Sequence, residues 1–232
     1  MSSKVSVIIA TYNRYSHLLN AINSVRTQTH KNIEIIVVND GSTQPEYSNM
    51  IIDVIQINLP ENTRKMFGFP CPGYCRTQGM KIATGDYIAF LDDDDIWLPN
   101  KIELQLEAMA KTGCLMSTTD AYADYEIYNP EKHYKCFYSE IDFQELQQIH
   151  RRQGSNMLDN GFPEIWNKRF AELHNCCMTS TVLIHKSIIE KTGYMDNVYI
   201  GQEDWSYWKR ILSHTDSVFI RQACVYYTRR QC

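Results

Sequence analysis

The sequence has no run of apolar residues long enough to span a bilayer as a helix, which takes about 20 residues. Its amino-terminal residues also lack the apolar core of a secretory signal peptide. We therefore expect a cytoplasmic protein with no transmembrane segment.

Positive charge is also scarce. The 232 residues include 23 Lys and Arg against 27 Asp and Glu, a net charge of −4, and the basic residues are scattered. Domains that bind nucleic acid usually carry a concentrated basic patch. Nucleic acid is therefore not an expected partner.

Cysteine patterns typical of metal centres are missing. Cys71 and Cys75 do not have the spacing of a zinc site, and no second spaced pair of Cys or His accompanies them. Disulfide bonds are not expected either, because the chain shows no secretory signal. We expect the eight cysteines to be free thiols, most of them buried.

What the sequence does have is an ordinary globular composition, 44% hydrophobic and 22% charged. Apolar runs at 5–10, 33–38 and 54–59 predict buried strands, and the segments between them, at 16–28 and 45–53, predict helices. This order predicts an α/β fold with a parallel sheet and right-handed crossovers. Such sheets bind their ligands outside the carboxyl ends of the strands.

The rest of the chain predicts further elements and one irregular region. A helix is expected at 74–84 with Gly85 as its C-cap, followed by a strand at 87–91. Residues 121–169 are rich in tyrosine and show no clean period, so they carry substrate specificity or form a loose insertion, and both interpretations stay open. The remaining expected elements are helices at 100–111 and 143–150 and one beginning near Trp205, and strands at 115–119, 178–185, 218–220 and 223–228.

Four carboxylates, Asp92 to Asp95, directly follow the strand at 87–91. Adjacent negative charges at the end of a buried strand repel one another and resist removal from water. One interpretation is a solvated acidic turn in which Asp95 caps the next helix. The other is a divalent cation held by carboxylate oxygens, with open positions for phosphate. The stretch alone leaves both interpretations open.

Four segments together resemble a known family. They read VSVIIATYNR, EIIVVNDGST, ATGDYIAFLDDDDIWLPNKI and GQEDWSYWKRI, in this order, and they span Val5 to Ile211. In these segments the sequence resembles the inverting family-2 glycosyltransferases of the GT-A fold. The resemblance implies a Rossmann-like, mostly parallel sheet flanked by helices, with a smaller antiparallel or irregular portion on the acceptor side. It implies one domain over 1–232, in which 1–120 bind a nucleotide sugar and 121–232 bind the acceptor.

The chemistry of this reaction needs two separated acidic sites. Breaking the bond between sugar and phosphate adds negative charge to the diphosphate, and a divalent cation held by carboxylates neutralises that charge. On the opposite face of the sugar, another carboxylate removes the proton of the attacking hydroxyl. A single displacement of this kind inverts the anomeric centre.

The resemblance assigns these roles to particular residues. Asp94 matches a metal ligand, and Asp92 or Asp93 is expected to reach the metal or the ribose. Asp40 matches the carboxylate that accepts a hydrogen bond from a uracil ring nitrogen, although an Asp-Gly pair is also a common turn. Asp204 matches the general base, although an acidic residue also favours the positive end of a helix.

A second group of residues is expected to bind the nucleotide or the acceptor. Thr11 and Tyr12 match a loop that lines the base, and the guanidinium groups of Arg14 and Arg76 suit the base or phosphate oxygens. The helical spacing of Trp205 and Trp208 favours core positions over stacking on a sugar. Candidate contacts to the acceptor or the phosphates are Glu203, Trp205, His174 and Arg229.

The expected activity is transfer of one hexosyl or N-acetylhexosaminyl group from a nucleotide sugar, a UDP-sugar in the first place, with Mn²⁺ or Mg²⁺. The acceptor is a glycan, a lipid-linked molecule or a protein. Absence of the Gln-x-x-Arg-Trp signature of processive relatives favours single transfer, and Ala10 and Thr77 replace a usual Pro and Asn without removing a charge. Two rival functions are a nucleotide-sugar-binding module without turnover and a nucleotidyltransferase, which would need a Gly-rich loop after the first strand.

Overall fold

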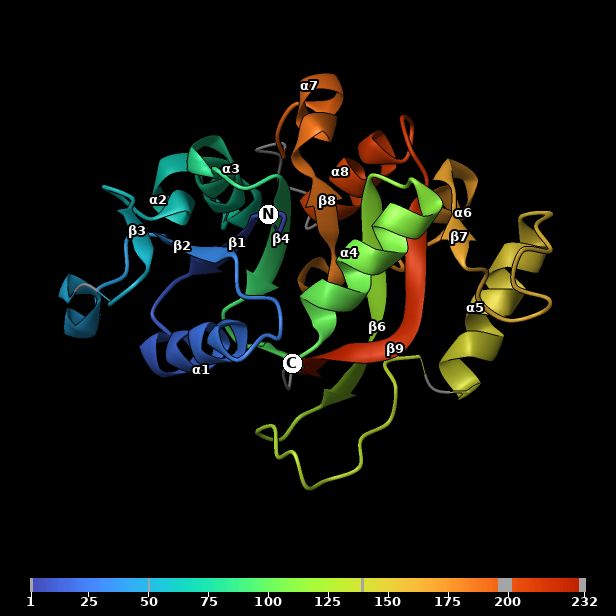
Figure 1. The fold of residues 1–232 in the computed structure, drawn as a ribbon, viewed down its shortest axis with the longest axis horizontal. Coiled ribbons are helices and arrows are strands. Elements are labelled where there is room, and N and C mark those ends of the chain that lie inside the picture. Colours follow the sequence, from blue (N-terminus) through green and yellow to red (C-terminus); the bar gives the residue numbers. More distant parts are fainter. Residues whose placement is uncertain (1, 50, 139, 196–201, 230–232) are drawn as a thin grey trace.

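The chain forms one mixed β-sheet covered by helices on both faces (Figure 1). The computed structural model describes residues 2–49, 51–138, 140–195 and 202–229. Along the sheet the strand order is β3-β2-β1-β4-β8-β6-β9-β5, and β7 pairs with β9 beside this path. The strands are β1 (Val5–Thr11), β2 (Ile33–Asn39), β3 (Ile55–Asn58), β4 (Tyr87–Asp92), β5 (Ile96–Trp97), β6 (Met116–Asp124), β7 (Ile165–Trp166), β8 (Leu183–His185) and β9 (Ser217–Thr228).

The half of the sheet built from β1, β2, β3 and β4 is parallel, as expected. Alternate residues of β1 point to opposite faces, so each face packs against its own helices. Val7 and Ile9 pack in one cluster with α1 (Tyr15–Arg26) and α4 (Lys101–Thr112). Ile8 packs on the other face. That second face carries α3 (Pro72–Ile82) and α8 (Glu203–Ile211).

The other half of the sheet is mixed. β8 runs antiparallel to β4 and β6, whereas β6 and β9 are parallel and shift register between Thr119 and Ala121. The remaining helices are short or lie at the periphery. They are α2 (Thr63–Phe67), α5 (Glu140–Arg152), α6 (Lys168–Leu173), α7 (Ile189–Thr192), η1 (Pro45–Ser48), η2 (Thr179–Thr181) and η3 (Lys186–Ile188). The 3₁₀ turn η2 is short but central, because it packs against β4, β6 and β9.

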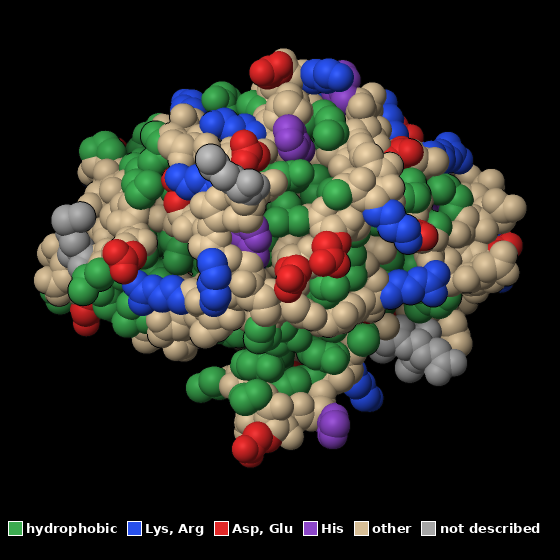
Figure 2. All heavy atoms as spheres, in the orientation of Figure 1, with side chains coloured by type: hydrophobic (Ala, Val, Ile, Leu, Met, Phe, Trp, Pro, Cys, Tyr) green, Lys and Arg blue, Asp and Glu red, His purple; other side chains and the backbone are tan. Residues whose placement is uncertain are grey.

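Part of the tyrosine-rich region forms an excursion from the body after β6 (Figure 1). Tyr128 and Tyr134 pack against Tyr226 of β9, which holds the base of the excursion to the sheet. The excursion exposes Tyr125 and Ile127, and Figure 2 shows hydrophobic side chains gathered where it leaves the body. The expected irregular portion is thus present, while its place on the acceptor side and the division of roles between 1–120 and 121–232 stay predictions.

Several local predictions were wrong. The helix expected at 45–53 is only the 3₁₀ turn η1, and the strand expected at 178–185 is η2 followed by the short β8. The two strands expected at 218–220 and 223–228 form the single strand β9. Gly85 does not cap α3, which ends at Ile82. An added Cβ on Gly85 would lie 2.8 Å from the backbone oxygen of Lys4, so glycine is needed for close packing on β1.

The described residues bear on the expectations about cysteines and about membrane-spanning helices. Their cysteines are all free, and each is buried except Cys136. Within these residues, every helix is too short or too polar to cross a lipid bilayer.

Candidate active site

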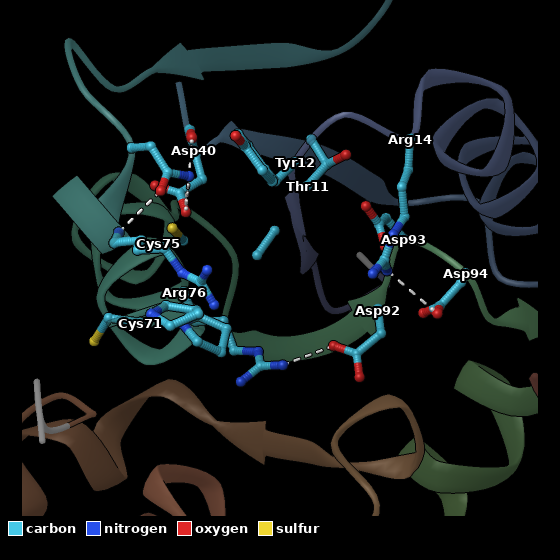
Figure 3. A pocket seen from close by; sticks show the side chains of 15 residues that line it. Thr11, Tyr12, Arg14, Asp40, Cys71, Cys75, Arg76, Asp92, Asp93 and Asp94 are labelled. Atoms are coloured by element: carbon cyan, nitrogen blue, oxygen red, sulfur yellow. Dashed lines mark hydrogen bonds and ion pairs between the residues drawn. The ribbon is translucent and has the colours of Figure 1, made fainter. Parts of the chain in front are cut away.

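A cavity of about 610 Å³ opens at the carboxyl ends of β1, β2 and β4 (Figure 3). It lies where the strand order places it, because parallel strands end at the same edge of the sheet. All the residues predicted to bind nucleotide or metal line this cavity. Its lining residues are Ala10, Thr11, Tyr12, Arg14, Asp40, Asn62, Arg64, Pro70, Cys71, Pro72, Cys75, Arg76, Asp92, Asp93 and Asp94.

Arg14 compensates part of the negative charge that follows β4. Its Nη1 donates to Asp93 Oδ1 at 2.9 Å and to Asp94 Oδ2 at 3.3 Å (Figure 3). Burial raises the pKa of the Asp93 carboxyl, while the Arg14 charge acts in the opposite direction. The acidic segment is therefore a charge-paired wall of the cavity rather than a solvated turn.

Asp95 is buried and does not cap a helix, which corrects the expectation from sequence. Residues 96–97 form β5, and α4 begins only at Lys101. Asp95 Oδ2 accepts a 2.5 Å hydrogen bond from Ser180 Oγ, and its Oδ1 accepts one from the Thr228 amide at 3.1 Å. Burial, followed by the neighbouring charge of Asp92, raises the pKa of the Asp95 carboxyl well above its ordinary value.

Arg76 joins the acidic segment to the beginning of α8. Its Nη2 donates to Asp92 Oδ1 at 2.7 Å, and its Nη1 donates to Glu203 Oε1 at 3.5 Å. Arg76 is only 6% exposed, and a buried guanidinium needs such partners. Burial lowers the Arg76 pKa, but the carboxylates of Asp92, Glu203 and Asp204 outweigh burial and raise it.

Asp204 lies in the first turn of α8, next to the Arg76 contact of Glu203. Its Oδ2 accepts a hydrogen bond from Thr179 Oγ1 at 3.3 Å, and its Oδ1 accepts one from the Trp205 amide at 2.6 Å. Asp204 does not line the cavity itself, but it is close enough to Arg76 to raise that residue's pKa. Arg76 thus contacts the predicted metal-binding segment through Asp92 and the neighbour of the predicted base through Glu203.

Asp40 lines the cavity, yet its carboxylate already accepts hydrogen bonds from neighbouring residues of the protein. Its Oδ1 accepts from the Thr63 amide at 2.7 Å, and its Oδ2 accepts from Thr63 Oγ1 at 2.7 Å and from Asn62 Nδ2 at 3.0 Å. Burial raises the Asp40 pKa, and the Thr63 hydrogen bonds oppose that effect. Asp40 therefore also anchors the start of α2, and its contact with a uracil ring stays a prediction.

Thr11 and Tyr12 form the β1 side of the cavity. Thr11 Oγ1 shares a 2.6 Å hydrogen bond with the hydroxyl of Tyr47, which in turn accepts one from the Arg14 amide. Tyr12 is 45% exposed at the rim, so its ring is not buried against its own sheet. Its position suits packing on a planar base.

The remaining candidates lie away from the cavity lining. Trp205 Nε1 donates to the Ala171 oxygen at 2.6 Å. Arg229 stacks over Phe137 at 5.7 Å, and its amide bonds to the Asp124 oxygen. His174 Nδ1 lies 3.7 Å from the Cys176 sulfur, and burial lowers the His174 pKa. Trp208 is fully buried, in agreement with its helical spacing.

Sequence reasoning missed two groups of site residues. Asn62, Arg64, Cys71 and Cys75 line the cavity from the segment 62–75, which was expected to be loop and helix without a role. Thr179 and Ser180 hold acidic residues but lie in a segment expected to be an ordinary strand. The Asn62-Thr63 pair was the one local signal, since Asn62 caps α2 by accepting from the Arg64 amide.

The acidic residues have the chemistry of a metal site but little preassembly. In the described part of the chain, no group of three or more His, Cys, Asp or Glu side chains is arranged to hold a metal ion. Asp92 and Asp94 line the same cavity, and each has an arginine contact. Carboxylate oxygens suit Mg²⁺ and Mn²⁺, and Mg²⁺ commonly takes one or two of them together with phosphate oxygens and water. The donor set therefore fits such a cation.

The sequence model of the family described as Glycosyl transferase family 2 matches residues 6–188. The chain belongs to glycosyltransferase family 2. The resemblance to this family is thereby confirmed. The match includes the cavity-lining strands and the acidic segment, and it ends before the fourth segment at 201–211.

This family-2 chain matches only part of several longer relatives and most of others. An uncharacterized glycosyltransferase of Rickettsia bellii is 41% identical over 119 residues, which are 50% of this chain and 16% of the relative. The chain spans 19% of each of two further Rickettsia relatives. An Escherichia coli protein is 32% identical over 217 residues, 90% of this chain and 70% of the relative. It is named UDP-Glc:alpha-D-GlcNAc-diphosphoundecaprenol beta-1,3-glucosyltransferase WfaP.

Solved structures share the fold. The crystal structure of S. aureus TarS 1-349 matches with a TM-score of 0.65 at 16% identity, over 97% of this chain and 60% of the TarS chain. A complex of the same protein with UDP-GlcNAc matches with a TM-score of 0.65 at 16% identity, over 99% of this chain and 59% of TarS. The expected α/β fold of the GT-A type is therefore confirmed.

Proposed function

We propose that this family-2 chain transfers one hexosyl or N-acetylhexosaminyl group from a UDP-sugar to an acceptor hydroxyl, with inversion of the anomeric centre. The observation that carries the proposal is the double contact of Arg76, to Asp92 at the end of β4 and to Glu203 beside Asp204. A direct displacement needs a leaving-group side and a base side held close together. Arg76 contacts Asp92 on the proposed leaving-group side and Glu203, the neighbour in sequence of the proposed base Asp204.

The donor side of the reaction belongs to the cavity. Its size and its three arginines, Arg14, Arg64 and Arg76, suit an anionic nucleotide. Tyr12 at the rim offers a ring for the base. A uridine nucleotide is favoured because TarS was crystallised with UDP and with UDP-GlcNAc, and because the name of WfaP includes UDP-Glc.

The acceptor side begins at α8. Asp204 is the general base of the proposal: its carboxylate takes the proton of the acceptor hydroxyl while that oxygen attacks the anomeric carbon. Thr179 and the Trp205 amide hold its two oxygens, so the carboxylate has a defined direction. Glu203 serves as the partner of Arg76.

Asp94 and Asp92 are the residues that would hold Mn²⁺ or Mg²⁺. Such a cation, when bound, supplies electrostatic stabilisation of the charge that develops on the leaving diphosphate. Arg14 and Arg76 already contact these carboxylates. Their guanidinium groups also line the cavity and would help to neutralise the charge of the same phosphates.

The test is release of UDP from a panel of donors, UDP-glucose, UDP-galactose, UDP-GlcNAc and UDP-GalNAc, with Mn²⁺, with Mg²⁺ and with a chelator. A sugar linked to diphosphoundecaprenol is the first acceptor to try, since the name of WfaP describes one, and a free glycan and a peptide follow. We expect metal-dependent transfer from one donor and its loss in Asp94→Asn. Asp216→Asn, at an exposed carboxylate outside the cavity, is the matched control and should retain activity.

Two other results would replace the proposal. Tight binding of UDP without transfer or hydrolysis of any donor would favour the binding module. Formation of a nucleotide sugar from UTP and a sugar 1-phosphate, with release of pyrophosphate, would favour a nucleotidyltransferase. The product's anomeric configuration, read by NMR, tests inversion separately.

A further inference from the structure

The 3₁₀ turn η2 (Thr179–Thr181) lies between the two acidic groups of the site. Its three residues are buried, and the turn packs against β4, β6 and β9. It is not part of the cavity lining. Two of its hydroxyl groups nevertheless bond to acidic residues of the site. Buried hydroxyl groups are usually hydrogen-bonded, so the partners of these side chains indicate what the turn does.

Ser180 holds the acidic segment in place. Its Oγ accepts a hydrogen bond from the Asp92 amide at 3.0 Å and donates one to Asp95 Oδ2 at 2.5 Å. Its backbone oxygen accepts from Trp97 Nε1 at 2.8 Å. Ser180 thus contacts the beginning and the end of the acidic segment and also β5, and it sets the path of the chain that presents Asp93 and Asp94.

Thr179 holds the other acidic group. Its Oγ1 donates to Asp204 Oδ2 at 3.3 Å, and the side chain is 6% exposed. This hydrogen bond is long, as bonds to catalytic groups often are before a substrate binds. The second oxygen of Asp204 bonds to its own helix end through the Trp205 amide. Among the described residues, Thr179 is therefore the side-chain donor that links Asp204 to the rest of the fold.

The turn itself is anchored independently of any ligand. The Thr181 oxygen accepts from Gln105 Nε2 of α4 at 2.9 Å, and Thr181 Oγ1 shares a 2.7 Å hydrogen bond with Thr118 of β6. All these groups are buried. Movement of η2 would break several buried hydrogen bonds at once, so the turn is a rigid reference point.

We propose that η2 sets the distance and the direction between the two acidic groups, with Thr179 as the positioning residue for Asp204 and Ser180 as the positioning residue for the acidic segment. This inference rests on the proposed function. It assigns different kinetic roles to neighbouring residues. Thr179 acts on the group that takes the acceptor proton, and Ser180 acts on the groups that face the donor.

The test compares Thr179→Val with Thr179→Ser in the full chain, using the donor and acceptor found in the transfer assay. Valine keeps the shape of threonine but removes the donor to Asp204, so kcat should fall about tenfold while KM for the donor and Kd for UDP stay within about twofold. Serine restores the hydroxyl and should restore kcat. Thr192→Val is the matched control, since Thr192 is 7% exposed and bonds to the Ile188 oxygen in α7.

Ser180→Ala should affect donor binding more than turnover. Loss of the acceptor for the Asp92 amide and of the donor to Asp95 should raise KM for the donor and Kd for UDP by about tenfold, with a smaller change in kcat. If Ser180→Ala does not fold, Asp95→Asn disturbs the same hydrogen bond from the other side and should shift the same constants.

The outcomes separate this inference from the proposed function. If Thr179→Val has the kinetic constants of Thr192→Val, η2 does not position Asp204, although the transferase activity stands. Equal losses of kcat in Thr179→Val and Thr179→Ser would also overturn the inference, since they would point to packing rather than to the hydroxyl. Absence of transfer by the unsubstituted protein overturns both.

Discussion

The two acidic regions of the site are held in different ways. The acidic segment after β4 is fixed by two arginines, by Ser180 and by the Thr228 amide, and Asp93 and Asp95 are buried. The pair Glu203-Asp204 begins a helix and has longer side-chain contacts, 3.5 Å to Arg76 and 3.3 Å from Thr179. The first region is a rigid wall, whereas the second is held by two longer contacts, to α3 and to η2.

This difference matches the work that we assign to each region. A wall that faces a charged diphosphate gains from fixed, charge-paired groups, because they need no rearrangement when charge develops. A group that takes a proton must meet a hydroxyl that arrives from solution, and its contacts can shorten when the substrate is bound. Single substitutions that act on one region or on the contact between the regions can test this contrast.

Asp204→Asn should have the largest effect. Asparagine keeps the size of the side chain but cannot accept the proton, so kcat for transfer should fall about 10²–10⁴-fold. UDP affinity, measured by calorimetry, should change less than about twofold, because the substitution leaves the β4 region intact. Unchanged kcat would remove Asp204 from the mechanism and with it the functional contrast between the regions.

Arg76→Met should break the connection between the regions. It leaves Asp92 and Glu203 without their shared partner, and loss of one member of a buried ion pair costs about 3 kcal/mol of unfolding free energy. Arg14→Met is the comparison, because the Arg14 side chain is 34% exposed and its loss should cost about 1 kcal/mol. Urea unfolding measures both, and equal losses would contradict the assigned role of Arg76.

Lys101 lies next to β5, the strand that follows the acidic segment, and its Nζ is 4.0 Å from the centre of the Trp97 ring. Burial, opposed by a smaller effect of Cys224, lowers its pKa to about 7 from an ordinary 10.5. Between these values the unfolded chain binds more protons than the folded one. Stability should therefore rise with pH from about 7 to 10.5, by at most about 1.4 kcal/mol per pH unit from this group.

The control for that slope is Lys101→Met, which keeps an apolar side chain of similar length over Trp97. Its unfolding free energy should vary less over the same pH range, and at pH 7 the protein should be at least as stable as the unsubstituted chain. Identical pH profiles for the two proteins would contradict the lowered pKa of Lys101.

Glu203→Gln should have the smallest effect. The contact that it weakens is the 3.5 Å one to Arg76, and Asp92 still pairs with that arginine. We expect a loss of about 1 kcal/mol or less in unfolding free energy and only a few-fold change in kcat. A loss as large as that of Arg76→Met would show that the second region is held as firmly as the first.

Much of the fold could be predicted from sequence because its signals are local. The apolar runs of β1 and β2 and the helical spacing in α1 appear within short windows, and the parallel order follows from their alternation. The placement of Asp40 and Asp92 at one edge follows from the same order. Gly85 and Asp95 were misassigned because a cap can be inferred from neighbours in sequence, whereas close packing on β1 or a bond to Ser180 cannot.

Short windows of sequence were enough to predict the parallel half of the sheet and the acidic residues at its edge, and four such windows in order were enough to indicate the family. Which charges meet, in contrast, depends on the folded chain. Arg76 and Glu203 are 127 residues apart and Asp95 and Ser180 are 85 apart, so their contacts depend on how α3, η2 and α8 pack on the sheet. Buried charges take whichever partners that packing brings within hydrogen-bonding distance.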